Sequence, residues 1–127
     1  MLKLRNDNGG NMTSIMKEFR DEDRNKIEYE RSENEISVLL ITGSFNNYYV
    51  WIEKKGNFSC KYAPRSGDSI AKANLANTLI IKYDYNSIKN FVEDESKSKE
   101  KIFDYLYTMV FKFLKVADIS TEEDIWD

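Results

Sequence analysis

The stretch YYVWIEKKGNFSCKY, residues 48–62, predicts a β-hairpin that sets the register of a sheet. Two runs rich in aromatic and β-branched residues flank residues 54–56, which have the composition of a turn. A three-residue loop there places Gly56 in the left-handed conformation, which glycine adopts without steric cost. This loop pairs Glu53 with Asn57 across the hairpin.

The register of this hairpin divides its side chains between two faces, because side chains alternate along a strand. The face that we expect to join the core carries Tyr48, Val50, Ile52, Phe58, Cys60 and Tyr62. Tyr49 and Trp51 fall on the second face, together with Ser59 and Lys61. The hairpin therefore leaves open what covers these two aromatic side chains.

The length of the loop that joins the preceding strand to the hairpin decides which side chains of that strand face the core. A two- or four-residue loop around Asn46 and Asn47 places Leu39 and Ile41 on the core face. The residues then expected beside Tyr49 and Trp51 are Ile36, Val38, Leu40 and Thr42. The second face is half apolar in this arrangement, and it exceeds what a short helix covers.

Four strand-like runs predict an antiparallel meander, since the gaps between them are too short for a parallel crossover. They cover residues 26–31, 36–42, 48–53 and 58–63. Before them, the helical spacing of Ile15, Met16 and Phe19 predicts a short N-terminal helix over residues 13–24. After them, residues 70–77 predict another short helix, and residues 78–83 fit either a helix or a fifth strand.

The strongest periodic pattern predicts a long C-terminal helix over residues 98–117, after a short helical stretch over residues 86–92. Apolar residues recur there at intervals of three and four: Ile102, Phe103, Leu106, Met109, Val110, Phe113, Leu114 and Ala117. The expected fold class is α+β, an antiparallel four- to five-stranded β-meander packed by this helix, with the short N-terminal helix beside it.

The chain divides into three expected segments. Residues 1–11 form a disordered lead with the flexible sequence NDNGGN, residues 12–117 form one α+β domain, and residues 118–127 form an acidic C-terminal tail. The codons of residues 9–11 are compatible with a bacterial ribosome-binding sequence, so we hypothesise that translation starts at Met12. The abundance of Lys, Asn and Ile is typical of an AT-rich bacterial or phage gene.

Composition argues against several functions. The chain has no histidine, which removes the commonest general base and zinc ligand, so we expect no enzyme, metal or other cofactor. Cys60 is the only cysteine and is expected to be a packed core residue. A net charge of −3 argues against direct nucleic-acid binding. No apolar run approaches a membrane span, and a cytoplasmic location is the expectation.

The remaining prediction is a small protein-binding module that blocks another protein, as a toxin immunity protein, an antitoxin or a phage anti-defence protein does. Its partner would be a toxin, nuclease or defence effector. The tail supplies five acids and no base, and the second face of the hairpin supplies aromatic groups. The predicted partner-binding residues are Tyr49, Trp51, Asp118, Glu122, Glu123, Asp124, Trp126 and Asp127.

Two alternatives stay open. The first is a small-ligand binder that sequesters a nucleotide-type signal, in which aromatic rings stack on the base and basic groups bind the phosphates. Its predicted residues are Tyr49, Trp51, Lys54, Lys61 and Arg65. The second is a dedicated chaperone that acts as a homodimer, which would lend its sheet face or its helices to one client.

Overall fold

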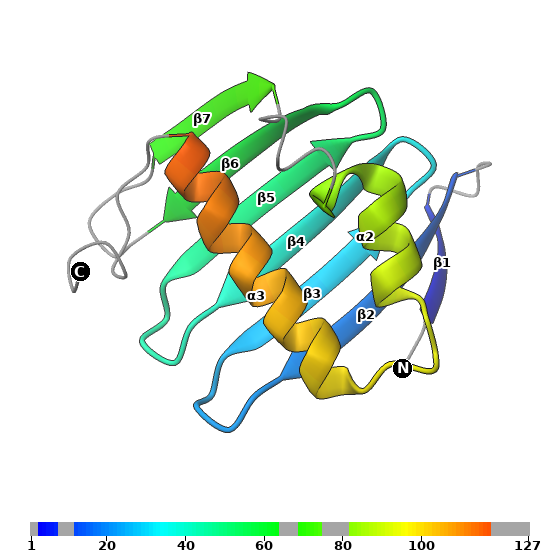
Figure 1. Ribbon diagram of the computed structural model, residues 1–127, viewed down its shortest axis with the longest axis horizontal. Coiled ribbons are helices and arrows are strands. Elements are labelled where there is room, and N and C mark those ends of the chain that lie inside the picture. The colour runs from blue at the N-terminus through cyan, green and yellow to red at the C-terminus, as the bar shows by residue number, and fades with distance from the viewer. Residues whose placement is uncertain (1–2, 8–11, 64–68, 75–81, 118–127) are drawn as a thin grey trace.

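The computed structural model describes residues 3–7, 12–63, 69–74 and 82–117, and it centres on one antiparallel sheet (Figure 1). Within these residues, seven strands pair in the order in which they follow along the chain, so the sheet is a meander. The strands are β1 (Lys3–Asp7), β2 (Met12–Arg20), β3 (Lys26–Arg31), β4 (Glu35–Ile41), β5 (Asn47–Glu53), β6 (Asn57–Ala63) and β7 (Ser69–Asn74).

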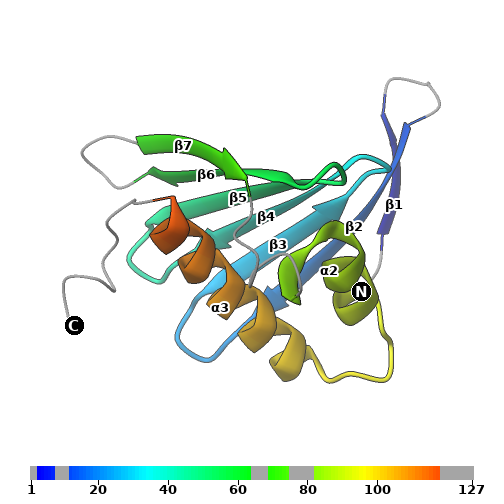
Figure 2. The ribbon, with the colours of Figure 1, turned by 45° about the horizontal axis from the view of Figure 1, so that its top comes forward.

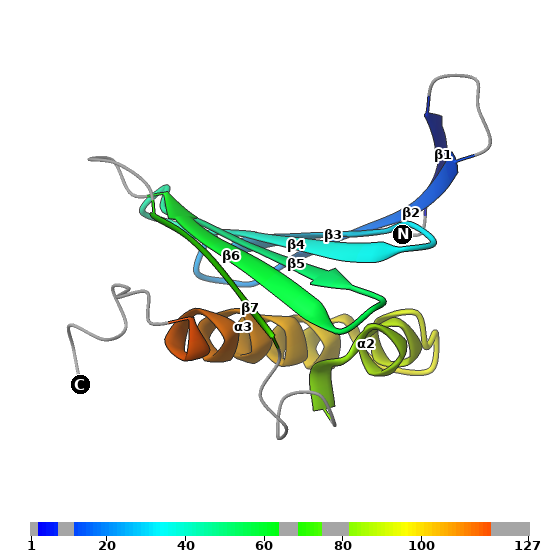
Figure 3. The ribbon, with the colours of Figure 1, turned by 90° about the horizontal axis from the view of Figure 1, so that it is seen from above.

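Two helices, α2 (Tyr85–Val92) and α3 (Lys99–Val116), cover one face of the sheet (Figures 2 and 3). The longer helix, α3, crosses the sheet diagonally and contacts β2 through β6. Side chains cap both helices: Asp84 accepts a hydrogen bond from the Ser87 backbone N–H at 2.7 Å, and Ser98 accepts one from Lys101 at 3.2 Å. The predicted α+β class, with an antiparallel sheet and a C-terminal helix, is confirmed.

The central strands match the sequence prediction closely. β3 has the predicted bounds, and β4, β5 and β6 each begin one residue earlier than predicted. The helix α3 differs from the predicted range by its two capping residues, Ser98 and Ala117. The sheet has more strands than predicted because β1, β2 and β7 join it. The short helix predicted over residues 70–77 is wrong where the structure describes it, because Ser69–Asn74 forms strand β7, and residues 75–77 lie outside the described residues. Of residues 78–83 only Lys82 and Tyr83, which are helical, are described.

The predicted short N-terminal helix is wrong, because residues 12–20 form strand β2. Phe19 lies opposite Ile27 of β3 and is buried on the helix-covered face, whereas Glu18 is exposed. The apolar residues of this segment fit a helix and a strand almost equally well, and pairing with β3 decides between them. Lys3–Asp7, within the predicted disordered lead, pairs with β2 as the edge strand β1.

The hairpin of β5 and β6 has the predicted register. Gly56 has a φ of +107°, and its backbone N–H donates a hydrogen bond to the Glu53 carbonyl at 2.9 Å. Ile52 lies opposite Phe58, so the predicted core face turns toward the helices. The buried residues on this face are Tyr48, Val50, Ile52, Phe58 and Cys60.

The predicted loop between β4 and β5 is wrong. Residues 43–45 form a three-residue loop, closed by the Thr42 backbone N–H, which donates to the Asn46 carbonyl at 3.0 Å. Phe45 has a φ of +66° and occupies the left-handed position that glycine usually takes in such loops. Because glycine is absent from that position, the sequence does not reveal the odd loop length.

The odd loop length exchanges the two faces of β4 relative to the prediction. The buried residues on the helix-covered face are Ile36, Val38 and Leu40. Leu39 and Ile41 lie on the opposite face, with Leu39 directly across from Tyr49. Both faces of β4 are apolar, as predicted, but the residues on each face are exchanged.

The loops and the helix α2 are attached to the sheet by polar contacts around Glu93. The Arg31 guanidinium donates two hydrogen bonds to the Glu93 carboxylate, one of them at 2.8 Å, and the Tyr29 hydroxyl donates a third at 2.7 Å. The hydroxyl of Tyr85 donates to the Ser32 carbonyl at 2.6 Å. Glu93 therefore connects the C-terminal end of α2 to β3, and Tyr85 connects the N-terminal end of α2 to the loop after β3.

We expect the stability of the chain to decrease as the pH falls below about 4.5, partly through Glu93. Burial raises the pKa of this carboxyl, but hydrogen bonds from Arg31 and Tyr29 outweigh burial, so its pKa lies below the usual 4.5. The unfolded chain therefore takes up the proton first, and the stabilisation present above this pH is lost as the pH falls through the folded-state pKa. Urea denaturation of the wild type and Glu93→Gln at neutral and acidic pH measures this effect. A difference in unfolding free energy that stays constant with pH would contradict it.

Candidate functional site

The sheet face opposite α2 and α3, which we call the open face, carries a stripe of apolar side chains. Among the described residues no helix covers this face (Figure 3). Leu39 and Ile41 of β4 and Tyr49 and Trp51 of β5 are half-buried there. The rings of Tyr49 and Trp51 stack, with their centroids 5.4 Å apart and their planes within 4° of each other. The stripe therefore presents flat apolar surface that a partner can cover.

In one row across the sheet, charged residues of opposite sign flank the stripe. Glu28, Leu39, Tyr49 and Lys61 lie in one row across β3, β4, β5 and β6. The Lys61 ammonium lies 5.7 Å from the centroid of the Tyr49 ring, and Glu28 pairs with Lys26 at 3.2 Å. The row thus runs from an acid through two apolar groups to a base.

The loop between β4 and β5, residues 43–45, which we call the hairpin tip, exposes a phenylalanine. The Phe45 side chain is 74% exposed, and its backbone has a φ of +66°. Its backbone N–H donates to the Thr42 carbonyl at 2.9 Å, which fixes the turn. The left-handed conformation costs a residue with a Cβ atom about 1–2 kcal/mol. The chain therefore holds a large apolar ring in solvent on a strained backbone.

The neighbouring turn between β2 and β3 braces the hairpin tip. The Gly43 backbone N–H donates to the Asn25 side-chain oxygen at 2.9 Å. Asn25 is itself held by Asp21, whose carboxylate accepts two hydrogen bonds from it at 2.8 Å. A Cβ atom at Gly43 would lie 2.8 Å from the Asp23 carbonyl oxygen, so only glycine fits this close approach. The two turns form one connected platform.

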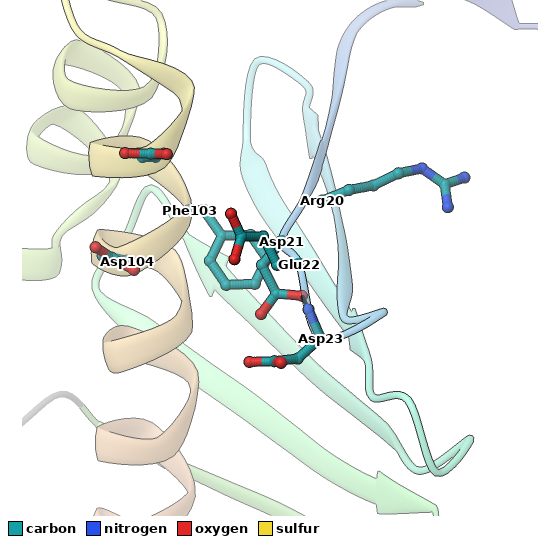
Figure 4. Close-up of a pocket in the computed structure, with 7 residues that line it drawn as sticks. Arg20, Asp21, Glu22, Asp23, Phe103 and Asp104 are labelled. Atoms are coloured by element: carbon teal, nitrogen blue, oxygen red, sulfur yellow. Dashed lines mark hydrogen bonds between the residues drawn. The ribbon is translucent and has the colours of Figure 1, made fainter.

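An acidic cavity of about 540 Å³ lies beside this platform, between the β2–β3 turn and the start of α3 (Figure 4). Figure 4 shows the carboxylates of Asp21, Glu22 and Asp23 beside Phe103, while Arg20 extends away from the cavity. Arg20 pairs with Glu18 at 2.9 Å. The acids that line the cavity are Asp21, Glu22, Asp23, Glu100 and Asp104. Within the described part of the chain, no three acidic or Cys side chains converge as metal ligands do.

The structure separates the residues predicted for nucleotide binding. Lys61 lies beside Tyr49 on the open face, but the Lys54 ammonium lies 5.4 Å from the ring of Tyr85, which belongs to α2 on the opposite side. Lys54 lines a second cavity of about 500 Å³ between the turns after β3 and β5. Neither described cavity is lined by Tyr49 or Trp51.

Several predicted site residues cannot be placed. The predicted residues that lie outside the described ranges are Arg65, Asp118, Glu122, Glu123, Asp124, Trp126 and Asp127. Their roles in binding a partner or a ligand stay predictions. Within the described residues, an acidic cluster like the one predicted for the tail lines the cavity beside α3.

Cys60 is fully buried at the centre of β6. Burial raises the pKa of its thiol to about 12, so the thiol is protonated at neutral pH. A buried, protonated thiol is a packing residue, as the sequence predicted, and it is far from the form that attacks substrates.

Among the helices that the structure describes, none has the length and apolar character required to cross a membrane.

Sequence reasoning did not identify Phe45 as a functional candidate. The signal was an aromatic residue within GSFNN, residues 43–47, a segment that otherwise has turn composition. Phenylalanine is uncommon at a turn position with positive φ. Comparison of the chain with protein-family models, with curated proteins and with solved structures finds no match.

Proposed function

We propose that the chain is a protein-binding module that blocks another protein, with Phe45 as the anchor that enters a pocket of the partner. Aromatic residues supply much of the binding energy of protein interfaces when they fill a desolvated pocket. Immunity proteins, antitoxins and phage anti-defence proteins act in this way, and the composition of the chain is consistent with such a role.

The observation that carries this proposal is the solvent-exposed ring of Phe45 on a strained, braced loop. An exposed ring contributes nothing to the core, and the left-handed backbone lowers stability. The hydrogen bond between the Gly43 backbone N–H and the Asn25 side chain restricts the loop, so less conformational entropy is lost when a partner binds. A rigid loop that presents an aromatic group at a cost in stability is the arrangement expected of a preorganised binding element.

The neighbouring charges indicate the chemistry of the partner. The cavity beside the braced turns is lined by five carboxylates and one arginine, which pairs with Glu18. We therefore propose an apolar pocket rimmed by Lys and Arg as the complementary surface. Sites that bind phosphate groups, including those of nucleases, have such basic surroundings. A nuclease or another basic effector accordingly fits the proposed partner best.

Phe45→Gly is expected to weaken partner binding by at least about tenfold while raising the free energy of unfolding by about 0.5–1 kcal/mol. Loss of the ring removes the anchor, and glycine relieves the left-handed strain at a smaller entropic cost. Affinity capture from the native host with the tagged full chain identifies the partner. Titration of the purified partner then measures binding and inhibition, and urea denaturation measures stability.

The matched control is Val116→Ser, which changes an apolar side chain that is also exposed but lies at the end of α3. It should leave capture unchanged. The proposal fails if Phe45→Gly captures and inhibits the partner as the wild type does. It also fails if a nucleotide panel stabilises the chain against heat and no protein partner is captured.

A further inference from the structure

We infer that the open face binds a second copy of this chain, face to face, around a two-fold axis that runs parallel to the strands between β4 and β5. Such packing of two sheets with nearly aligned strands is a common arrangement, in which the sheets lie about 10 Å apart and their side chains meet between them. The inference concerns the open face alone and does not depend on the role of Phe45.

The charges of the row that runs from Glu28 to Lys61 favour this axis. Glu28 lies on one side of the stripe and Lys61 on the other, at the same level along the strands. Rotation about an axis parallel to the strands places Glu28 of each copy opposite Lys61 of the other. Rotation about an in-plane axis that runs perpendicular to the strands along this row would instead bring Glu28 onto Glu28 and Lys61 onto Lys61, which is unfavourable.

The sizes of the central side chains also match under this rotation. Leu39 and Tyr49 are direct neighbours in the row, so each Leu39 meets the Tyr49 ring of the second copy. In the next row, Ser37 lies across from Trp51 within one chain, so each Ser37 meets the indole of the second copy. A small residue opposite the largest one allows the two faces to approach closely.

The shape of the sheet edge is compatible with this packing. β1 rises from the sheet on the side of the open face (Figure 3). An axis between β4 and β5 leaves four strands on one side and three on the other. β1 of each copy consequently lies one strand spacing, about 4.8 Å, outside β7 of the second copy. The raised edge strand therefore lies beside the second copy's β7 and not over it.

Rotation about this axis preserves the direction of the strands. The two hairpin tips, each with its exposed Phe45, therefore lie at the same end of the dimer. If the proposed function holds, the dimer presents two anchors to one side, which increases avidity for a partner that has two sites.

Sedimentation velocity of the purified full chain across a range of concentrations tests the inference. The wild type should form dimers, and Glu28→Lys and Lys61→Glu should each weaken self-association by at least about tenfold, because each creates two like-charge contacts. The double variant Glu28→Lys/Lys61→Glu should restore the dimer. Ser37→Glu, which inserts a larger charged group opposite Trp51, should also abolish it.

The control is Glu95→Lys, a charge reversal at an exposed position beyond α2, which should leave the dimer intact. Circular dichroism checks that each variant folds. If a charge variant fails to fold, the Ser37→Glu variant tests the dimer in its place. A monomeric wild type, dimeric single variants, or a double variant that stays monomeric would each overturn the inference. Phe45→Gly should remain dimeric, so failure of the proposed function is distinguishable from failure of the dimer.

Discussion

Phe113→Ala is expected to lower the free energy of unfolding by about 3–5 kcal/mol. Phe113 is fully buried between α3 and the sheet, with its ring centroid 4.7 Å from that of Phe58 and 6.0 Å from that of Tyr83. Truncation removes these contacts and leaves a cavity where the helix crosses the strands. Because α3 contacts five strands, the surrounding structure cannot collapse locally to fill the space.

Urea denaturation followed by circular dichroism measures this loss, and Phe45→Ala is the matched control. It removes the same atoms from a side chain that is 74% exposed, so the free energy of unfolding should change by no more than about 0.5 kcal/mol. Equal losses for the two variants would show that Phe113 does not lie in a packed interior.

Glu93→Ala is expected to lower the free energy of unfolding by about 3 kcal/mol, the second large effect. The side chains of Glu93 and Arg31 are only 16% and 15% exposed. Removal of the carboxylate leaves the Arg31 guanidinium and the Tyr29 hydroxyl without the acceptor that they share. The variant also loses the contact that fixes the end of α2 to β3.

The matched control for this variant is Glu95→Ala, which removes the same charge from an exposed position two residues away. Its free energy of unfolding should stay within about 0.5 kcal/mol of the wild-type value. The double variant Arg31→Met/Glu93→Leu should recover part of the loss, because it leaves no charge unpaired. A Glu93→Ala variant as stable as the control would contradict the role of this contact.

The sheet centre and the last helix were predictable because their signals are local. Alternation along β3 to β6 and the recurrence of apolar residues along α3 arise from the periods of strand and helix. Gly56 marks the β5–β6 turn because the turn requires a positive φ. In these segments the residue types agree with the conformation that the fold imposes.

The remaining features depend on contacts that no local pattern encodes. β2 has apolar spacing that fits two conformations, and its neighbour β3 determines which one forms. The faces of β4 depend on the length of a single loop, and Phe45 occupies the position where glycine would have revealed that length. The proposed anchor Phe45 was missed for the same reason, because it is the residue that departs from the rule for the turn.

The strictly sequential strand order affects how the molecule opens. Each described strand pairs only with strands adjacent in the chain, so the edge strands β1 and β7 can detach without breaking any pairing in the centre. The helix α3 connects β2 through β6 and makes these strands one cooperative unit. Protection from hydrogen exchange should therefore increase from both edges toward the centre of the sheet, and the hairpin that carries Phe45 belongs to the region that opens last.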